Sequence, residues 1–490
     1  MAGAFCLFLI KNDRTAKYWA LFITLINALI SISLYTGFDS LSYKFQFAEL
    51  HSWIPAYDIN YVIGVDGISL LMVLLTTFIM PLCVLCSWKY IDKRVKEFLF
   101  CLLLMETAMI GVFAALDFVL FYVFWEFMLI PMYLLIAIWG GPNKKYASIK
   151  FFIYTLAGSV LLLVALIALY VTSGTFFIPG LMGQPYSFVF QIWIFLAFAL
   201  AFAIKVPMFP FHTWLPAAHV EAPTAGSVVL ASVLLKMGAY GFLRFCLPIT
   251  PLASHYFMPF LLGLSIISII YGGYVALGQN DMKKLIAYSS VGHMGFVTLG
   301  IFVLNFRGIE GAVLQMLNHG ITTGALFICV GIIYERTHRR NIADNSALGK
   351  IMPLYVTFFG IFSLSALAFP GTNSFVGEIL VLIGAFTHSN LIGALAIPGA
   401  ILAAAYMLRL LQKIIWADQP GHHAHQEHGD DPHEEGDKRH LWDLDAREFF
   451  VLAFLTIFVF YIGFHPGPFL EVMNASISHL VEQINCATLL

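Results

Sequence analysis

Apolar segments about as long as a lipid bilayer is thick recur along almost the whole of this 490-residue chain. A helix that crosses the hydrocarbon core needs ~20 mostly apolar residues, because each residue adds only about 1.5 Å along the helix axis. The composition agrees, since 60% of the residues are hydrophobic and only 11% are charged. These segments leave no room for a sizeable water-soluble domain. The sequence therefore predicts an all-α polytopic membrane protein.

Charged residues and turns divide the apolar sequence into thirteen long helical segments. We expect them near residues 18–36, 63–88, 98–115, 117–139, 146–173, 188–206, 222–246, 256–277, 283–304, 309–334, 351–387, 391–416 and 447–465. The first ten residues are also apolar, but they rise only ~15 Å, about half of a bilayer core. They predict a shortened first helix, as a start codon assigned too late would leave, and bring the nominal count to fourteen. A signal peptide is not expected, because no basic region precedes this stretch.

Two of these segments contain residues that break helices. Pro207 and Pro210 follow directly on Lys205, and Pro370 interrupts the segment 351–387. Proline lacks the backbone N–H and clashes with the preceding turn, so it ends or bends a helix. Inside a membrane, such breaks are tolerated where they are buried in protein or line a wet cavity. We therefore expect two broken helices.

Basic residues gather on alternate loops. They lie in the loops at residues 11–17, 89–96, 144–145, 283–284 and 336–340. By the positive-inside rule these loops face the cytoplasm, so the C-terminus is expected on the outer or periplasmic side. The formal net charge of -2 gives no indication of a nucleic-acid partner.

Four charged residues stand alone within apolar segments, namely Glu126, Lys205, Lys236 and Glu378. On insertion scales, placing a charged side chain at the centre of a membrane helix costs roughly 2.5 to 3.5 kcal/mol of free energy. Such a residue is therefore expected to face a polar interior or to have a function. Purely structural ion pairs are the alternative. For Lys236, a position near the membrane interface is a further alternative, because Arg244 follows eight residues later.

The spacing of these charges suggests an internal repeat. Lys205 and Lys236 are 31 residues apart, and Glu378 and Arg409 are separated by the same distance. Transporters are often built from two halves inverted across the membrane, each with a broken helix near the midplane. We therefore predict two inverted five-helix repeats. The predicted divisions are 1–97 (N-terminal helices), 98–246 (first repeat), 256–416 (second repeat), 417–446 (His-rich loop) and 447–490 (C-terminal helix and tail).

The types of these residues suit proton transfer. A proton can cross ~30 Å of hydrocarbon only through closely spaced groups that change protonation. Glu126 with Lys205 has the composition of such a pair, Lys236 could pass a proton to His293 or His319, and Glu378 would be the exit. Supporting roles are predicted for Glu106, His212, His219, His293 and His319, although satisfied core histidines, helix caps or simple packing are the structural alternatives.

Other features carry less information. The seven cysteines lie mostly in apolar segments and are interpreted as core residues. The segment 421–440 holds six histidines with several carboxylates, which could bind a metal but is predicted to be a solvated cytoplasmic loop without one. We find no flavin, haem, quinone or iron–sulfur signature in the sequence. Any electron transfer is therefore expected to occur in partner chains.

Five segments that carry these residues resemble the antiporter-like membrane subunits of proton-pumping NADH:quinone oxidoreductase, respiratory complex I. They are FYVFWEFMLIPMYLLIAIWG (121–140), AIKVPMFPFHTWLPAAHVEAPTAGSVVLASVLLKMGAYGFLRF (203–245), DMKKLIAYSSVGHMGF (281–296), LNHGITTGALFICVG (317–331) and FPGTNSFVGE (369–378). The resemblance spans residues 60 to 416. Glu378 stands where two sister subunits carry lysine, so the chain is similar to the M-type (chain 4) branch. Ala217 departs from the family, where aspartate is common, and the N-terminus is short.

The resemblance implies proton translocation coupled to electron transfer elsewhere in a complex. It implies Glu126 paired with Lys205, a connecting Lys236, histidines along a central axis, and Glu378 as the terminal group. The implied partners are the other membrane-arm subunits, including the L-type and N-type subunits and the lateral helix of the L-type subunit. NADH, FMN, iron–sulfur clusters and quinone would belong to partner subunits. The implied location is the bacterial or mitochondrial inner membrane.

Two other functions remain open from the sequence. Related subunits with similar glutamate and lysine motifs occur in multi-subunit sodium/proton antiporters and in membrane-bound hydrogenases. A membrane spacer that holds pumping subunits together without conducting protons itself is an alternative of another class.

Overall fold

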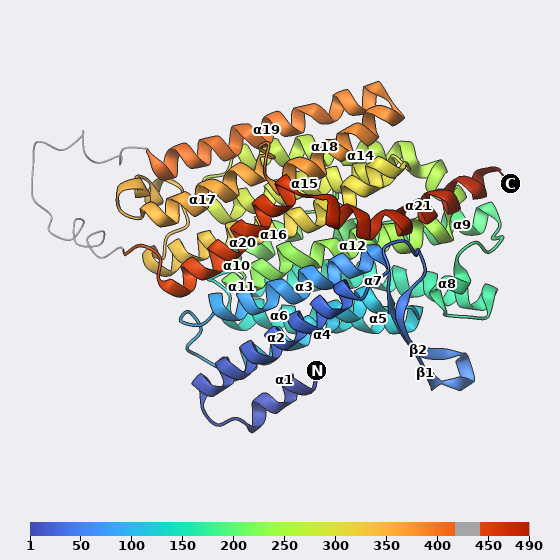
Figure 1. Cartoon of the computed structure of the whole chain (residues 1–490), viewed down its shortest axis with the longest axis horizontal. Helices are drawn as coiled ribbons and strands as arrows, with labels where there is room; N and C mark the ends of the chain where they lie inside the picture. The colour runs from blue at the N-terminus through green and yellow to red at the C-terminus, as the bar shows by residue number, and fades with distance from the viewer. Residues whose placement is uncertain (417–441, 490) are drawn as a thin grey trace, which may run out of the picture.

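The computed structural model describes residues 1–416 and 442–489, and 79% of these described residues are helical. Its helices are α1 (Ala2–Cys6), α2 (Asp13–Thr36), α3 (Gly67–Cys86), α4 (Val95–Ala114), α5 (Phe118–Phe127), α6 (Leu129–Trp139), α7 (Lys144–Ser173), α8 (Ile178–Leu181), α9 (Phe188–Lys205), α10 (Trp214–Glu221), α11 (Thr224–Val229), α12 (Leu235–Gly241), α13 (Leu247–Ile249), α14 (Pro251–Leu277), α15 (Met282–Phe302), α16 (Phe306–Thr337), α17 (Pro353–Ala366), α18 (Asn373–His388), α19 (Asn390–Ile415), α20 (Ala446–Phe464) and α21 (Gly467–Leu489). The two strands are β1 (Gln46–Ile54) and β2 (Ile59–Val65). The long helices run roughly side by side along one direction (Figure 1).

Within the described residues, twelve helices are long and apolar enough to cross a membrane, or thirteen if one bent pair counts as a single span. The chain is thus a multi-pass membrane protein, but the expected count of fourteen is not confirmed. The expected first helix is only α1 and a 3-10 turn at Leu7–Leu9. The expected segment 351–387 is divided into α17 and α18, which are 14 and 16 residues long.

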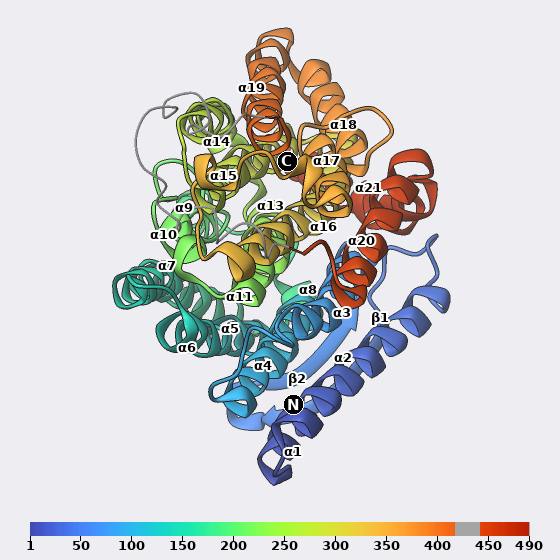
Figure 2. The same ribbon diagram turned by 90° about the vertical axis from the view of Figure 1, so that its left-hand side faces the viewer.

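Three spans form the centre of the bundle. The most apolar windows of Thr224–Ile249 and α16 are 100% buried, and that of α15 is 94% buried. The corresponding window of α2 is only 22% buried, which leaves its apolar side chains for lipid or partner chains. In the end-on view α16 lies between the N-terminal helices and the group α17–α19 (Figure 2). The fully buried central helices are thus surrounded by helices that bury a smaller part of their surface.

Both predicted helix breaks are present. Pro207 and Pro210 lie in the turn between α9 and α10, where Nε1 of Trp214 donates to the carbonyl oxygen of Ile204 at 2.8 Å. Pro370 lies between α17 and α18, and Gly371 adopts a φ of +91° that L side chains rarely tolerate. Side chains bind backbone groups at both breaks, since Oγ1 of Thr372 likewise donates to the carbonyl oxygen of Phe369 at 2.7 Å.

The central span Thr224–Ile249 is irregular in a way that the sequence does not predict. Two π-helical turns, Leu230–Leu234 and Phe242–Cys246, flank α12. A π turn inserts one extra residue into an α-helix and occurs frequently at functional sites. Lys236 lies two residues after the first of these turns, in α12.

The all-helical membrane fold is confirmed, and the structure adds a β-hairpin at residues 46–65 that was not predicted from the sequence. β1 and β2 pair antiparallel, with Glu49 opposite Ile63 and Ile54 opposite Ile59. The hairpin packs on the bundle through β2, because the backbone N–H of Leu116 donates to the carbonyl of Val62 at 2.8 Å.

The end of the chain also differs from prediction. Residues 467–489 form the helix α21 where a tail was expected after a single C-terminal helix. Pro466 separates α21 from α20, as expected of a residue that cannot continue a helix. The His-rich segment 421–440 lies outside the described residues.

Candidate functional site

Four buried polar residues from the central helices and α18 form a row that we call the central axis: Lys236, His319, His293 and Glu378. None of the four is more than 6% exposed. Lys236 comes from α12, His319 from α16, His293 from α15 and Glu378 from α18. A row of ionisable side chains inside a membrane bundle is expensive to bury and is therefore a candidate functional site.

Lys236 and His319 are in direct contact. Nζ of Lys236 lies 2.7 Å from Nδ1 of His319, and it also donates to the carbonyl oxygen of Ala231. Ala231 belongs to the π-helical turn Leu230–Leu234, so the irregular backbone takes part in holding the ammonium. With Lys236 as the donor, Nδ1 of His319 is the acceptor and its proton is carried on Nε2. A lysine that snorkels towards the interface is ruled out, since Lys236 is fully buried.

His293 and Glu378 form the other end of the axis. Nδ1 of His293 lies 2.9 Å from Oε1 of Glu378, and Nε2 of Gln315 donates to the same oxygen at 3.0 Å. The hydroxyl of Tyr406 lies 3.2 Å from Nε2 of His293. The ring centroids of His293 and His319 are 5.8 Å apart, so the two contacting pairs are neighbours.

The sequence left open whether His293 or His319 would follow Lys236, and the structure places both in the axis in series. It also adds two residues that sequence reasoning missed. Gln315 precedes His319 by four residues on α16 and so shares its helix face, a spacing that could have indicated it. Tyr406 carried no such signal, because it is one aromatic residue in an apolar helix.

Lys205 is the last residue of α9 and is 1% exposed. Its Nζ lies 5.0 Å from the ring centroid of Trp125 and 6.0 Å from that of Phe151. Such cation–π contacts are worth ~2 kcal/mol or more when both groups are desolvated. Among the residues that the structure describes, this ammonium has no hydrogen-bond partner. The ion pair with Glu126 that the resemblance implies is therefore not closed in this structure.

Glu126 nevertheless lies beside Lys205. The two side chains are close enough to interact electrostatically, and Trp125, the residue before Glu126, carries the ring next to the ammonium. Glu126 belongs to the last turn of α5, shortly before Pro131 in α6. Because Pro131 cannot donate to the carbonyl four residues earlier, the helical hydrogen bonds are interrupted close to Glu126.

The supporting candidates occupy separate positions. Glu106 is 1% exposed in α4, remote in sequence from the central axis. His219 in α10 stacks on Phe327 with ring centroids 4.5 Å apart, and His212 lies 5.0 Å from the ring of Tyr271. Within residues 1–416 and 442–489, both ring nitrogens of both histidines lack hydrogen-bond partners. Neither histidine acts as the helix cap that was considered for them.

The equal spacing of Lys205 to Lys236 and of Glu378 to Arg409 is not matched by equal surroundings. Lys236 is fully buried, whereas Arg409 is exposed and donates to the carbonyl oxygen of Leu277. An exposed arginine bound to a backbone carbonyl has a structural role at this position. The buried residue that α19 directs to the axis is Tyr406.

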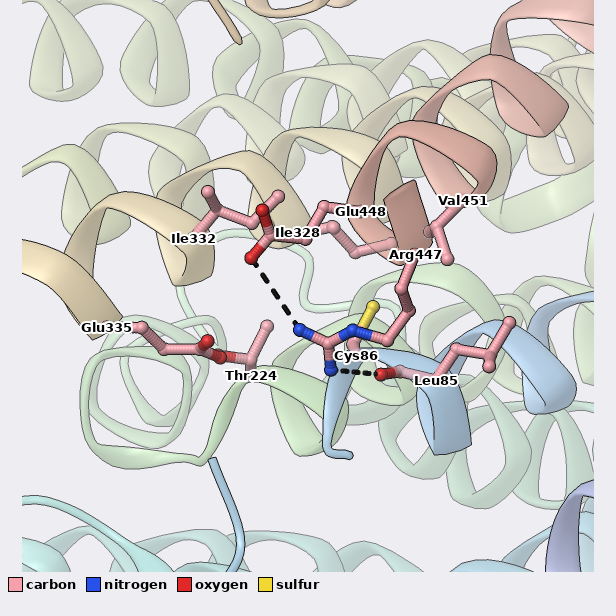
Figure 3. A pocket seen from close by; sticks show the side chains of 9 residues that line it. All are labelled: Leu85, Cys86, Thr224, Ile328, Ile332, Glu335, Arg447, Glu448 and Val451. Atoms are coloured by element: carbon pink, nitrogen blue, oxygen red, sulfur yellow. Dashed lines mark hydrogen bonds and ion pairs between the residues drawn. The ribbon is translucent and has the colours of Figure 1, made fainter. Parts of the chain in front are cut away.

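A second polar cluster lies where α3 ends and α11 and α20 begin, against the last turns of α16 (Figure 3). Nη1 of Arg447 donates to the carbonyl oxygen of Leu85 at 2.7 Å, and its Nη2 lies 3.6 Å from Glu448. Glu335 and Thr224 line the same small cavity. The sequence did not predict this cluster, which ties α20 to the central helices.

Chemically, the central axis can pass a proton. An ammonium can donate to a neutral imidazole, and an imidazole can accept at one nitrogen and release from the other near neutral pH. A carboxylate that accepts a bond from a second imidazole can take up the proton at the far end. A helical membrane bundle with two broken helices and such an axis defines the class of antiporter-like transport subunits.

Comparison with known proteins agrees. Residues 115–403 match the family model for NADH:quinone oxidoreductase/Mrp antiporter transmembrane proteins, and residues 5–112 match that for the amino terminus of NADH-ubiquinone oxidoreductase chain 4. The chain is 45% identical to NADH-quinone oxidoreductase subunit M of Rhodobacter capsulatus, over 96% of this chain and 91% of the relative. It is 43% identical to NADH-ubiquinone oxidoreductase chain 4 of Chondrus crispus, over 99% and 96% respectively. The chain belongs to the subunit M (chain 4) family of these oxidoreductases.

Solved structures agree on the fold. A chain of respiratory complex I from Thermus thermophilus superposes with a TM-score of 0.87 at 30% identity, covering 99% of this chain and 97% of that one. A chain of the Mrp complex from Dietzia sp. gives a TM-score of 0.81 at 20% identity, covering 97% of this chain and 53% of that one. At that identity the second similarity shows the shared fold alone.

Proposed function

We propose that this chain is a proton-translocating membrane subunit of an NADH:quinone oxidoreductase. The observation that carries the proposal is the central axis, in which Lys236 contacts His319 and His293 contacts Glu378. It supplies titratable groups in series through the most buried helices of the bundle. Two imidazole rings at the separation of His319 and His293 can exchange a proton by ring rotation or through one bridging water.

Electron transfer in this proposal takes place in partner chains. NADH, FMN, iron–sulfur clusters and quinone would be bound by those chains, and energy would reach the axis as changes of charge or conformation. We expect Glu126 and Lys205 to form the input pair, which closes when Glu126 moves onto the ammonium. Glu106, His212 and His219 would support proton entry.

The proposed partners are the other membrane-arm subunits of the oxidoreductase. The N-type and L-type antiporter-like subunits and the lateral helix of the L-type subunit would cover the lipid-length apolar faces that the bundle leaves open, such as that of α2. The proposed location is the bacterial or mitochondrial inner membrane, with the C-terminus on the outer side by the positive-inside rule.

The alternatives are less well supported. A sodium/proton antiporter or a hydrogenase would use the same fold, and the Mrp structure is similar in fold, but the relatives of 40–45% identity over nearly the full chain are named as oxidoreductase subunits. A non-conducting spacer has no need of Lys236, His319, His293 and Glu378 in buried series, because a buried ion pair can usually be replaced by apolar residues without loss of stability.

The proposal is tested by replacing both Lys205 and Glu126 with alanine in the whole oxidoreductase, reconstituted into proteoliposomes. The expected result is assembled enzyme in which proton uptake falls with respect to NADH oxidation. Undiminished pumping by the assembled double variant would favour the spacer.

A further inference from the structure

The cytoplasmic end of α10 is held by side chains from two distant parts of the chain. α10 is the short helix that follows the first break, and it ends at Glu221 with Ala222 as its C-cap. Three consecutive residues, Val220, Glu221 and Ala222, are each bound from outside the helix. The cations among the binding groups come from the region predicted as the second repeat.

Lys283 provides the first contact. Its Nζ donates to the carbonyl oxygen of Ala222 at 2.9 Å, and the residue is only 4% exposed. A cation at a helix C-terminus satisfies a free carbonyl and interacts favourably with the helix dipole. The next residue, Lys284, is exposed, and among the described residues its side chain forms no hydrogen bond or ion pair with α10. Two adjacent lysines thus have different surroundings.

Arg340 provides the second contact. Its Nη1 donates to the carbonyl oxygen of Val220 at 2.6 Å and lies 3.9 Å from the carboxylate of Glu221. The Nε of Arg340 is also 3.8 Å from Asp281, and the backbone N–H of Met282 donates to the carbonyl of Arg340 at 3.0 Å. The loop after α16 and the start of α15 therefore form one unit around the end of α10.

Glu221 connects this unit to the first half of the chain. Its Oε2 accepts from the backbone N–H of Asn143 at 2.9 Å, and its carbonyl accepts from the N–H of Gly141 at the same distance. A Cβ at Gly141 would lie 2.6 Å from this carboxylate, so glycine is needed for the approach. The turn between α6 and α7 is thereby attached to the same helix end.

The position of α10 matters because of the break before it. Helical hydrogen bonds do not run continuously from α9 into α10, so α10 is held by side-chain contacts, among them those at its far end. α10 carries His219, and α16, on which its ring stacks, also carries His319 of the central axis. Among the described residues, the only aromatic ring that stacks on this imidazole is that of Phe327.

We propose that Lys283 and Arg340 are positioning residues that hold α10 against the second half of the chain and so keep His219 stacked on α16, the helix that carries His319. This inference rests on the proposed function and deepens it. The contacts of Lys283 and Arg340 with residues 220–222, which we call the latch, couple the first broken helix to α15 and to the loop after α16. A conformational change in one half of the chain would then be transmitted to the proton-carrying groups of the other half.

The test uses the whole oxidoreductase with Lys283→Met, Lys283→Arg and Lys284→Met. We expect Lys283→Met to assemble, to lower the number of protons pumped per NADH by at least half, and to raise hydrogen exchange at the α10 amides by roughly tenfold. Lys283→Arg should restore both readouts, because a guanidinium can cap the same carbonyl. Lys284→Met should behave as wild type.

Two outcomes would overturn the latch. The first is unchanged exchange in α10 in Lys283→Met. The second is an equal effect of Lys284→Met. If Lys283→Met does not assemble, Arg340→Gln, which removes a more exposed contact with the same helix end, gives the same readouts. Raised exchange in α10 without any loss of pumping would contradict the link to His219 and leave the proposed function standing. Normal pumping by variants of the central axis would instead contradict the proposed function itself.

Discussion

Nζ of Lys236 lies 2.7 Å from Nδ1 of His319, and the two residues are 0% and 2% exposed. They come from different helices and are 83 residues apart in the chain. A buried lysine in contact with an imidazole is unusual, because two protonated groups would repel each other and one must be neutral. The pair can therefore hold one proton and pass it in either direction.

The bridging histidine provides the first prediction. His319→Asn in the whole enzyme should lower NADH-driven proton pumping by roughly tenfold or more, because asparagine cannot accept and release a proton at pH 7. Pumping is measured in proteoliposomes with a pH-sensitive dye. The matched control is His338→Asn, a change at an exposed histidine with a φ of 51° that asparagine tolerates. Similar pumping by the two variants would remove His319 from the pathway.

The second prediction concerns Glu378, the terminal carboxylate. Glu378→Gln keeps the size of the side chain and an oxygen for the bond from Gln315, but it removes the charge that His293 contacts. We expect assembly with severely reduced pumping, whereas Glu378→Asp should retain a measurable part of it. Wild-type pumping by the Gln variant would show that Glu378 need not titrate.

The third prediction concerns the input pair, Glu126 and Lys205. Glu126→Gln should greatly lower coupled activity without preventing assembly, and Glu126→Asp should retain much of it. The reason is that Lys205 lies against Trp125 rather than in a closed ion pair, so the bundle does not depend on this carboxylate for packing. Activity is measured as NADH oxidation with and without an uncoupler. Equal coupled rates in wild type and in the Gln variant would contradict this role.

The fourth prediction concerns stability and pH. Burial alone would raise the pKa of Asp66, but the Arg244 guanidinium at 2.6 Å and the hydrogen bonds from Ser69 together lower it. This pair therefore stabilises the fold above the ordinary carboxyl pKa, and the contribution is lost as the pH falls through the lowered value. Asp66→Asn should lower the free energy of unfolding by about 3 to 5 kcal/mol at pH 7, because it leaves Arg244 without its carboxylate partner in a largely buried position.

Thermal unfolding of the detergent-solubilised chain measures this effect. The control Asp92→Asn, at an exposed site, should change the midpoint little. The difference between wild type and Asp66→Asn should begin to shrink below about pH 4, where the carboxyl of the unfolded chain becomes protonated, and should be lost as the pH falls through the lowered pKa of the folded protein. A difference that is independent of pH would show that shape, and not charge, is responsible.

Much of the architecture follows from the sequence because bilayer length and proline act locally. The helix breaks around Pro207 and Pro370 were predicted from single residues, and both exist. The hairpin at residues 46–65 was missed, although two runs rich in aromatic and β-branched residues flank the turn sequence PAYD. The helix α21 was missed because its carboxylates and low hydropathy do not suit a membrane span.

The site was predictable only in part. Lone charges such as Lys236 and Glu378 are visible in a sequence because lipid penalises them wherever they lie. Which group each one contacts depends on helix packing over long sequence distances, such as the 113 residues between Tyr406 and His293. For the same reason the sequence could not show that Lys205 rests on Trp125, or that Lys283 and Lys284 have different surroundings.

The most direct test of the central axis is the number of protons pumped per NADH by the whole enzyme carrying Lys236→Met, compared with Lys350→Met at an exposed lysine. Methionine fills the space of the lysine stem but carries no proton. The axis predicts an assembled enzyme with fewer protons pumped per NADH in Lys236→Met, and a wild-type ratio in Lys350→Met. A wild-type ratio in Lys236→Met would contradict the account.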